Sequence, residues 1–281
     1  MSPDEYCRQK AAASGSSFYY AFLFLPPERR RAITALYAFC REVDDAVDAV
    51  HEPQVSAAKL AWWRNELGNL FSGRAEHPVA QALQPALEPF GITQERLGEI
   101  ISGMEMDLTQ TRYLDFAALE HYCYLVAGAV GLLAAGIFGY RDPRTLDYAR
   151  TLGTAFQLTN IVRDVGEDAR KGRIYLPLDD LRRFDVSAED ILRSRPSEAF
   201  RALMAFQAQR ADTYYAQALA ALPAVDRRAQ RPGLIMAAIY RTLLAEIARD
   251  DFRVLTHRTS LTPLRKLWIA WKTWLTGRVA A

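Results

Sequence analysis

Residues 27–48 of the chain read PERRRAITALYAFCREVDDAVD, and this stretch predicts a long amphipathic helix. Its apolar residues recur at steps of three and four: Ile33, Leu36, Tyr37, Cys40, Val43 and Val47. This period places them on one face of an α-helix. Pro27 suits the first helical turn, and Pro53 is expected to end the helix. No segment of the chain shows the strict alternation of a strand, so the predicted fold class is all-α.

The second half of this helix carries Asp44, Asp45 and Asp48. Asp44 and Asp48 are one turn apart and share a face, and Arg41 lies one turn before Asp44 and Asp45. Like charges at this spacing destabilise a helix by roughly 0.2–0.5 kcal/mol, and aspartate is a weak helix former. A bound metal ion would reverse the sign of the repulsion. The stretch is therefore either a solvated acidic face or a cation site.

A second acidic stretch, residues 157–168, reads QLTNIVRDVGED. Its polar residues form one stripe at steps of three or four: Gln157, Asn160, Asp164 and Asp168. The stripe follows the apolar residues 152–156, which places it at the buried end of a helix. Gly166 lies inside the stripe, and glycine costs about 1 kcal/mol in a helix interior. We therefore expect the helix to loosen beyond Asp164.

Two acidic stripes from distant parts of the chain predict a magnesium site if they face each other. Mg²⁺ prefers carboxylates, water and substrate phosphates as ligands. The predicted ligands are Asp44, Asp45, Asp48, Asn160, Asp164 and Asp168. Like charges about 4 Å apart repel by about 4 kcal/mol at an effective dielectric constant of about 20, so divalent cations and a polyanionic substrate would stabilise the cluster together.

Basic residues near the stripes are suited to neutralising a diphosphate leaving group. They are Arg41, Arg163, Lys171 and Arg173. Each of them can instead form a surface ion pair.

Helical periodicity continues along the chain and predicts one all-α domain, residues 1–281, of about ten helices. The expected helical blocks after Pro53 are 55–72, 78–89, 93–111, 115–139, 142–170, 187–194, 197–222, 232–257 and 262–276. The block at 125–138 is apolar on nearly all sides, so we expect it at the centre. Its many alanines and glycines permit either close helix packing or a tunnel for an apolar chain.

Two segments carry further candidate substrate contacts. Tyr122 opens the sequence YCYLVAG, where its ring could face a carbocation and its hydroxyl could relay a proton. An amphipathic core edge explains the same tyrosine. Residues 14–22 read SGSSFYYAF and offer hydroxyls for diphosphate and aromatic rings for a channel, or an ordinary helix-breaking turn.

Residues 262–276 form an amphipathic C-terminal segment. Its apolar residues fall on one side: Leu264, Leu267, Trp268, Trp271, Trp274 and Leu275. Arg265, Lys266 and Lys272 flank them. The pattern is typical of an interfacial helix at a membrane surface, and a last helix docked on the core is the other interpretation.

The composition argues against several other classes of protein. Lys plus Arg number 35 and Asp plus Glu 33, so no strongly basic surface for nucleic acid is expected. The acidic N-terminus lacks the apolar segment of a signal peptide, and no uncharged apolar run reaches the length of about 18 residues that a membrane span needs. Cys7, Cys40 and Cys123 have no metal-like spacing and are expected to be reduced thiols of a cytosolic protein.

These motifs resemble the squalene/phytoene synthase family of head-to-head prenyl transferases over roughly residues 4–260. The similar segments are DDAVD (44–48), YCYLVAG (122–128), NIVRD (160–164) with Asp168, and GRIYLP (172–177). Within the family, SGSSFYY and FLPPERRRAI (24–33) are most similar to presqualene diphosphate synthase of the bacterial hopanoid pathway. The resemblance implies an isoprenoid-synthase helical bundle around a central cavity, with Mg²⁺ as cofactor.

The resemblance also implies roles for individual residues. Together with the residue patterns, it assigns catalysis to Tyr122, Arg41, Asp44, Asp48, Asp164 and Asp168. It assigns substrate binding to Ser17, Phe18, Tyr37, Arg41, Gln157, Asn160, Arg163, Arg173, Tyr240 and Arg258.

The implied reaction joins two farnesyl diphosphates into presqualene diphosphate, and a phytoene or dehydrosqualene synthase is the nearest alternative. No Gly-x-Gly-x-x-Gly motif follows a strand, which disfavours a full squalene synthase that needs a reductant. A non-enzymatic helical assembly protein would have no use for two acidic stripes. The expected location is the cytoplasm, compatible with peripheral contact at the inner face of a membrane and with transfer to a downstream enzyme of the squalene pathway.

Overall fold

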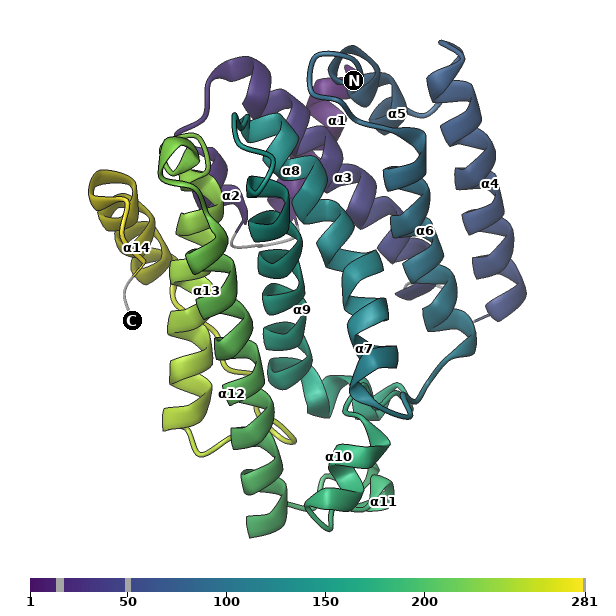
Figure 1. Ribbon diagram of the computed structural model, residues 1–281. Coiled ribbons are helices and arrows are strands. Elements are labelled where there is room, and N and C mark those ends of the chain that lie inside the picture. Colours follow the sequence, from purple (N-terminus) through teal and green to yellow (C-terminus); the bar gives the residue numbers. More distant parts are fainter. Residues whose placement is uncertain (14–17, 49–51, 280–281) are drawn as a thin grey trace.

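The computed structural model describes residues 1–13, 18–48 and 52–279, and this part of the chain is built from helices (Figure 1). They are α1 (Pro3–Ala13), α2 (Phe18–Phe22), α3 (Pro27–Asp48), α4 (Pro53–Phe71), α5 (Pro78–Leu83), α6 (Gln94–Thr109), α7 (Phe116–Cys123), α8 (Ala129–Phe138), α9 (Thr145–Arg170), α10 (Leu178–Arg183), α11 (Ala188–Leu192), α12 (Glu198–Ala221), α13 (Arg231–Arg249) and α14 (Pro263–Thr276). Short 3-10 turns lie at Gln84–Ala86 and Ala224–Asp226, and a π-helical turn, Tyr124–Gly128, joins α7 to α8. The described residues contain no β-strand, which confirms the all-α prediction.

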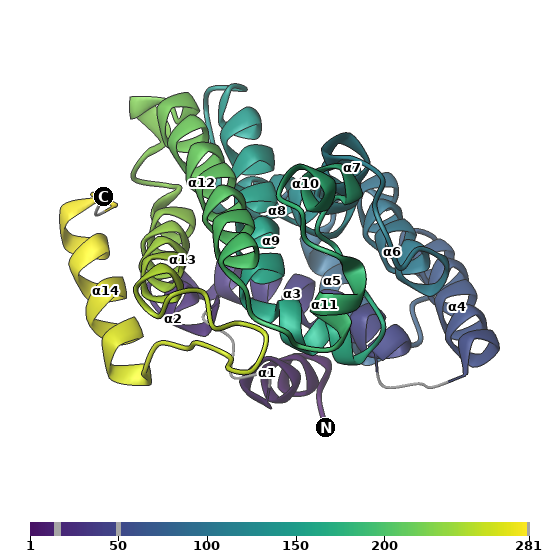
Figure 2. The same cartoon turned by 90° about the horizontal axis from the view of Figure 1, so that it is seen from below.

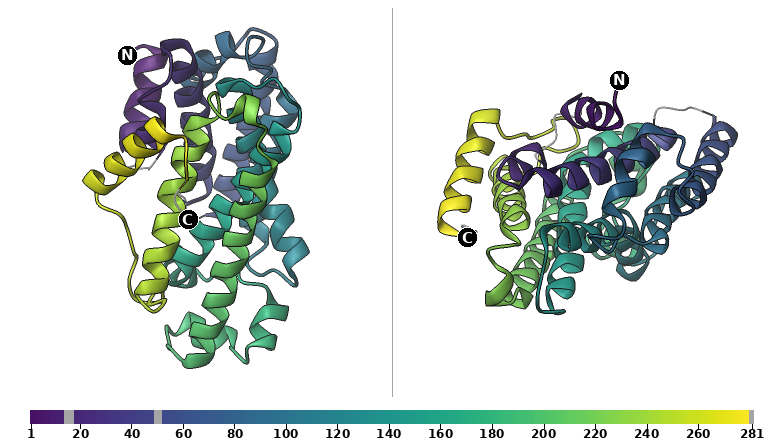
Figure 3. Two further views of the ribbon diagram at one scale, coloured as in Figure 1. Left: turned by 60° about the vertical axis from the view of Figure 1, so that its left-hand side comes forward. Right: turned by 90° about the horizontal axis from the view of Figure 1, so that it is seen from above.

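Helix α9 lies at the centre of the bundle. It packs against α8, the π-helical turn, α12 and α13, while α3 packs against α4, α6 and α8 on the other side (Figures 1 and 3). Seen from below, α14 lies at the outer edge beside α13 (Figure 2). The two helices that carry the acidic stripes, α3 and α9, therefore belong to opposite walls of the bundle.

Several predicted helix ends differ from the structure. Pro53 opens α4 rather than closing the preceding helix, as its missing N–H allows at a first helical position. The block expected at 232–257 ends at Arg249, because Asp251 and Phe252 adopt left-handed backbone angles, with φ of 56° and 51°. Helix α1 was not predicted, since it is short and only Cys7 of it is buried.

The expectation that Gly166 loosens its helix is wrong, because α9 continues to Arg170. A Cβ atom at Gly166 would lie 2.3 Å from the Leu255 carbonyl oxygen and 2.5 Å from that of Val254. The Gly166 N–H also donates a hydrogen bond to the Val254 carbonyl at 3.2 Å. The glycine is therefore needed for close approach of the chain that follows α13, and packing outweighs its low helix propensity.

The small residues of the apolar block serve both purposes that the sequence left open. A Cβ atom on Gly153 of α9 would lie 2.3 Å from the Ala127 carbonyl oxygen, so the glycine allows close packing of the two helical segments. Ala127, Ala134 and Gly131 line an internal cavity. The block at 125–138 thus packs closely on α9 and at the same time lines the cavity.

The continuous helical segment Phe116–Phe138 is long and apolar enough to cross a membrane by length and composition. The expectation that no uncharged apolar run reaches about 18 residues is wrong, because residues 122–140 are all uncharged and are apolar or glycine. Half of its most apolar window is buried inside the protein, and it packs against α6 and α9. A central core helix has the same composition, and that is the place the segment occupies here.

Candidate active site

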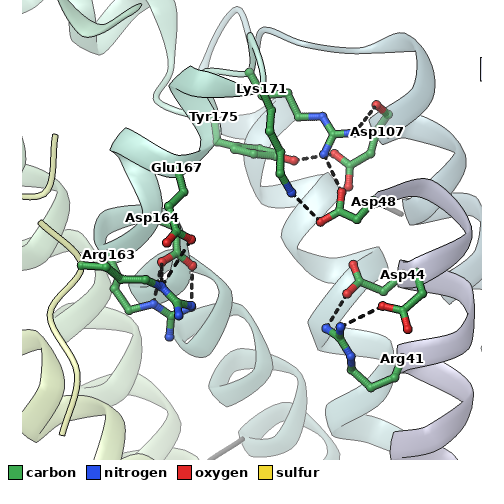
Figure 4. A network of polar contacts seen from close by, with 12 residues as sticks. Arg41, Asp44, Asp48, Asp107, Arg163, Asp164, Glu167, Lys171 and Tyr175 are labelled. Atoms are coloured by element: carbon green, nitrogen blue, oxygen red, sulfur yellow. Dashed lines mark hydrogen bonds and ion pairs between the residues drawn. The ribbon is translucent and has the colours of Figure 1, made fainter. Parts of the chain in front are cut away.

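The acidic residues of α3 and α9 face each other across a cleft of about 510 Å³ (Figure 4). Asp44 and Asp48 enter it from α3, and Asp164, Glu167 and Asp168 enter it from α9. The i, i+4 spacing of each helix aims its carboxylates at the same face, and the fold turns the two faces toward each other.

Basic side chains hold the carboxylates of the α3 wall. Arg41 reaches Asp44 at 2.6 Å and Asp45 at 2.9 Å. Lys171 and Arg173, which follow α9, reach across the cleft to Asp48 at 2.8 Å and 3.0 Å. These two ion pairs join the walls at one end of the cleft.

A second basic group holds the α9 wall. Arg163 pairs with its neighbour Asp164. Arg258, from the chain after α13, reaches Asp164 at 2.9 Å and Glu167 at 3.3 Å. The close contact of residues 254–255 with Gly166 positions the chain that carries Arg258.

The charges of the cleft balance before any substrate binds. Its lining includes six acidic residues, Asp44, Asp48, Asp107, Asp164, Glu167 and Asp168, and six basic residues, Arg41, Arg163, Lys171, Arg173, Arg258 and Lys266. A polyanionic diphosphate would upset this balance. Cations that entered the cleft with the diphosphate would offset its charge.

Two carboxylates of the cleft resist ionisation. Withdrawal from solvent raises the pKa of Asp44 to about 6 despite the attraction of Arg41, and the like charges of Asp48 and Asp45 contribute. Burial, followed by the charge of Asp164, raises the pKa of Asp168 to about 7. Both groups would be stabilised in their charged form by a bound cation.

Asp48 and Asp164 behave in the opposite way. Burial works to raise their pKa values, but hydrogen bonds outweigh it and lower them. The donors are Lys171 and Arg173 for Asp48, and Arg163 and Arg258 for Asp164. Each wall therefore combines one carboxyl whose pKa is lowered by basic partners with one whose pKa stays raised.

The groups present fit Mg²⁺. The amide oxygen of Asn160 is buried and, within the part of the chain that the structure describes, accepts no hydrogen bond. No described side chain donates to or pairs with the Asp168 carboxylate either. Among the described residues, no three His, Cys, Asp or Glu side chains form a complete metal cage. Mg²⁺ needs none, because it binds through one or two carboxylates, water and substrate phosphates.

The structure places one predicted site residue, Asp45, away from the cleft. Asp45 is absent from the cleft lining and pairs with Lys10 of α1 at 2.9 Å, because it is one position removed from the Asp44–Asp48 face. Ser17 lies outside the described residues. Phe18 opens α2, which packs beside α13.

An apolar cavity of about 200 Å³ adjoins the polar cleft. Six residues line both: Tyr37, Cys40, Val126, Gln157, Asn160 and Tyr240. Gln157 and Tyr240, predicted to contact substrate, therefore lie at the junction. An apolar chain attached to a diphosphate would extend from the cleft into this cavity.

Tyr122 lies in a cluster of polar aromatic residues at the side of the cleft. Its hydroxyl donates to the Asp107 carboxylate at 2.8 Å, and the Tyr175 hydroxyl donates to the other oxygen at 2.7 Å. The rings of Tyr122 and Tyr175 stack with centroids 5.2 Å apart. Burial, with the Asp107 charge, raises the pKa of Tyr122 well above its usual value, so the phenol stays protonated.

Sequence reasoning gave Asp107 no role, although it is central to this cluster. It is 8% exposed, and burial raises its pKa despite the two tyrosine hydrogen bonds. Ile100, Met104 and Asp107 follow one another at helical spacing on α6. The sequence feature that could have identified Asp107 is an aspartate on an otherwise apolar helix face.

This geometry allows a two-step proton transfer. The Tyr122 hydroxyl oxygen can accept a proton from a molecule in the cleft as its own proton passes to Asp107. A buried carboxylate with a raised pKa is a suitable final acceptor. Asp107 would then act as a positioning residue and proton store behind Tyr122.

Asp107→Asn is expected to lower turnover by about tenfold to a hundredfold, because asparagine keeps an acceptor for one tyrosine but cannot take up the proton. Turnover measured for Asp107→Asn, Tyr122→Phe and the double variant tests the coupling. The double variant should be no worse than Tyr122→Phe alone. Fully additive losses would contradict a shared role, and a lower melting temperature alone would indicate a structural one.

The fold and site together define an all-α enzyme for substrates that combine an anionic head with an apolar chain. The chain matches the family described as Squalene/phytoene synthase over residues 11–265. It therefore belongs to the squalene/phytoene synthase family, as its motifs predicted.

Relatives and solved structures agree with this assignment. The chain is 36% identical to the 15-cis-phytoene synthase of Synechocystis, covering 98% of this chain and 85% of the relative. It is 37% identical to the phytoene synthase of Arthrospira platensis, with coverages of 94% and 89%.

Among solved structures, a dehydrosqualene synthase in complex with ligand superposes with a TM-score of 0.89 at 29% identity, covering 98% of this chain and 97% of the other. Squalene synthase HpnC from Alicyclobacillus acidocaldarius has a TM-score of 0.81, also at 29% identity, with coverages of 89% and 94%.

Proposed function

We propose that this protein condenses two molecules of farnesyl diphosphate head to head into presqualene diphosphate and releases one diphosphate. One observation carries the proposal: two acidic helix faces with paired basic residues face each other directly above an apolar cavity. Membership of the squalene/phytoene synthase family supports the reaction class.

The polar cleft would hold the diphosphates, with Mg²⁺ bound between them and Asp44, Asp48, Asn160, Asp164 and Asp168. Mg²⁺ supplies Lewis-acid neutralisation of the leaving diphosphate. Arg41 and Arg163 lie beside the carboxylates and would donate hydrogen bonds to diphosphate oxygens, as Arg173 and Arg258 would from the cleft ends. These preorganised donors stabilise the charge that develops on the leaving group.

The carbon chemistry takes place at the junction of cleft and cavity. The C1–O bond of one farnesyl diphosphate breaks, and its electron pair leaves with the diphosphate. The C2=C3 double bond of the second molecule then attacks the allylic C1 cation, which leaves a tertiary cation at C3. Loss of a proton from the attacked C1 closes the cyclopropane, and Tyr122 with Asp107 would accept that proton. The second diphosphate is retained.

Phytoene and dehydrosqualene synthesis are the competing functions, because relatives and a solved structure carry these names. The apolar cavity supports the shorter farnesyl chain. The bulky side chains of Phe22, Phe138 and Tyr148 line it and would limit the length of an inserted prenyl chain.

The test is to incubate the purified full-length chain with farnesyl diphosphate, geranylgeranyl diphosphate or both, with Mg²⁺ and no nicotinamide cofactor, and to identify the lipid by mass spectrometry. Presqualene diphosphate is expected from farnesyl diphosphate, with one inorganic diphosphate released for each pair of molecules consumed. Preferred formation of phytoene, or release of both diphosphates with dehydrosqualene as product, would assign the protein to a competing function.

A further inference from the structure

We propose that the outer face of α14 docks this protein on a lipid surface that carries anionic headgroups. Five large apolar side chains are exposed on this helix: Leu264 (80%), Trp268 (57%), Leu275 (57%), Trp271 (48%) and Leu267 (43%). At 3.6 residues per turn they span an arc of about 100°. They therefore form one continuous stripe rather than scattered contacts.

The opposite face of α14 is held by the protein. Ala270 and Thr273 are buried, and the Trp274 ring stacks on Phe24 with centroids 4.9 Å apart. The helix packs on α13 and α2 and lies at the edge of the molecule (Figures 1 and 2). The interpretation of a helix docked on the core therefore holds for one face, and the face that stays exposed is apolar as well.

The charge around the stripe selects the partner. Helix α14 itself contains three basic residues, Arg265, Lys266 and Lys272, and no Asp or Glu, and Lys266 lines the cleft. Lys272 and Arg265 adjoin one edge of the apolar arc and are exposed, with Arg265 also paired to Glu246 at 2.6 Å. Tryptophan and leucine beside basic residues are typical of helices that lie in the headgroup region of an anionic membrane.

The position of α14 relates the lipid surface to the apolar cavity. Trp274 and Phe24 line a surface pocket of about 500 Å³ together with Phe138 and Pro232. Phe138 and Pro232 also line the apolar cavity beside the cleft. The surface pocket beside α14 and the apolar cavity therefore have the side chains of Phe138 and Pro232 in common. This link to the product rests on the proposed function, whereas the docking surface rests on α14 alone.

A second copy of the chain would cover the same stripe less well. Two α14 faces brought together would place Lys272 and Arg265 of both copies in one interface, with no acidic residue of this segment to pair with them. Anionic headgroups would neutralise the same charges. The lipid surface is therefore the occupant that the charge favours.

The test uses flotation of the purified full-length chain with vesicles of phosphatidylcholine alone or of equal parts phosphatidylcholine and phosphatidylglycerol. We expect binding to the mixed vesicles that weakens as salt is raised. The triple variant Leu267→Ser, Trp268→Ser, Trp271→Ser should lower the partition coefficient by about tenfold or more, because it removes three inserting side chains. Lys272→Glu should lower it by about tenfold on mixed vesicles only.

A double variant, Trp62→Ser with Leu192→Ser, is the matched control, since these side chains are 43% and 41% exposed on α4 and α11. It should bind as the wild type does. The α14 variants and the double-variant control should keep wild-type turnover in detergent, which verifies folding. Asp44→Asn, although inactive, should bind vesicles normally. Unchanged binding of the triple variant would overturn the proposal. The proposal would also be overturned if the wild type did not bind vesicles and the triple variant changed only the oligomeric state. That result would assign the stripe to a second copy.

Discussion

Asp44→Asn is expected to lower turnover by about a thousandfold or more while the protein stays folded. Asp44 contributes one of the carboxylates available to Mg²⁺ and diphosphate on the α3 wall, and loss of a group that stabilises a developing charge costs about a hundredfold to a thousandfold or more. Turnover with farnesyl diphosphate and Mg²⁺ measures the effect.

The stability of this variant should not fall. The pKa of Asp44 is raised to about 6 by withdrawal from solvent, so ionising this carboxyl costs more in the folded protein than in the unfolded chain. Stability contributed by such a group decreases as pH rises toward that value, and asparagine removes the charge altogether. We expect a melting temperature equal to or above that of the wild type at pH 8, measured without Mg²⁺ or substrate.

Asp164→Asn should also abolish turnover. Unlike Asp44→Asn, it should lower the stability of the protein. Its pKa is lowered by Arg163 and Arg258, and its removal leaves both guanidinium groups without this partner. The free energy of unfolding is expected to fall by about 1–3 kcal/mol.

Asp45→Asn is the matched control for both variants. Asp45 is adjacent to Asp44 and lies outside the cleft lining, where it pairs with Lys10 and with Arg41. Arg41 keeps Asp44 as a partner when Asp45 is replaced. It should keep turnover within about threefold of the wild type, since exposed ion pairs contribute about 1 kcal/mol or less. An active Asp44→Asn enzyme, or an inactive Asp45→Asn enzyme, would refute the assignment of the α3 face.

Gly166→Ala is expected to lower kcat/KM by about a hundredfold although the residue touches no substrate. The added methyl group would lie 2.3 Å from the Leu255 carbonyl oxygen, so the chain after α13 has to move. That chain carries Arg258, which holds Asp164 and Glu167. A displacement of about 1 Å in a binding group can lower the rate by about a hundredfold.

Stability should fall in the same variant. Overpacking costs about 1–3 kcal/mol of stability. Helix propensity returns about 1 kcal/mol when alanine replaces glycine, so the net effect is a loss when the overpacking cost lies above that gain. Each kcal/mol corresponds to a shift of about 2–4 °C in the melting temperature of a chain of this size.

The matched control for this prediction is Gly68→Ala in the interior of α4. A Cβ atom there meets nothing within 4 Å, so alanine should raise the melting temperature slightly and leave turnover unchanged. A Gly166→Ala enzyme that gained stability and kept its rate would mean that the contact with residues 254–255 has no functional part.

The all-α fold and the two acidic faces could be predicted from the sequence. The spacing of Asp44 and Asp48, and of Asn160, Asp164 and Asp168, is set within a single helix, so the shared face follows from helix geometry alone. The small residues of the apolar block likewise indicated space or close packing without deciding between them.

Tertiary structure decided which groups meet. Asp107 on α6 reaches Tyr122 on α7, Arg258 reaches Asp164, and Gly166 fits against residues 254–255 only because distant segments pack together. Helix period specifies the face on which a side chain lies, but the partner on that face depends on contacts between residues far apart in the chain. For the same reason, the amphipathic pattern of α14 could not reveal which of its sides packs on the protein and which stays exposed.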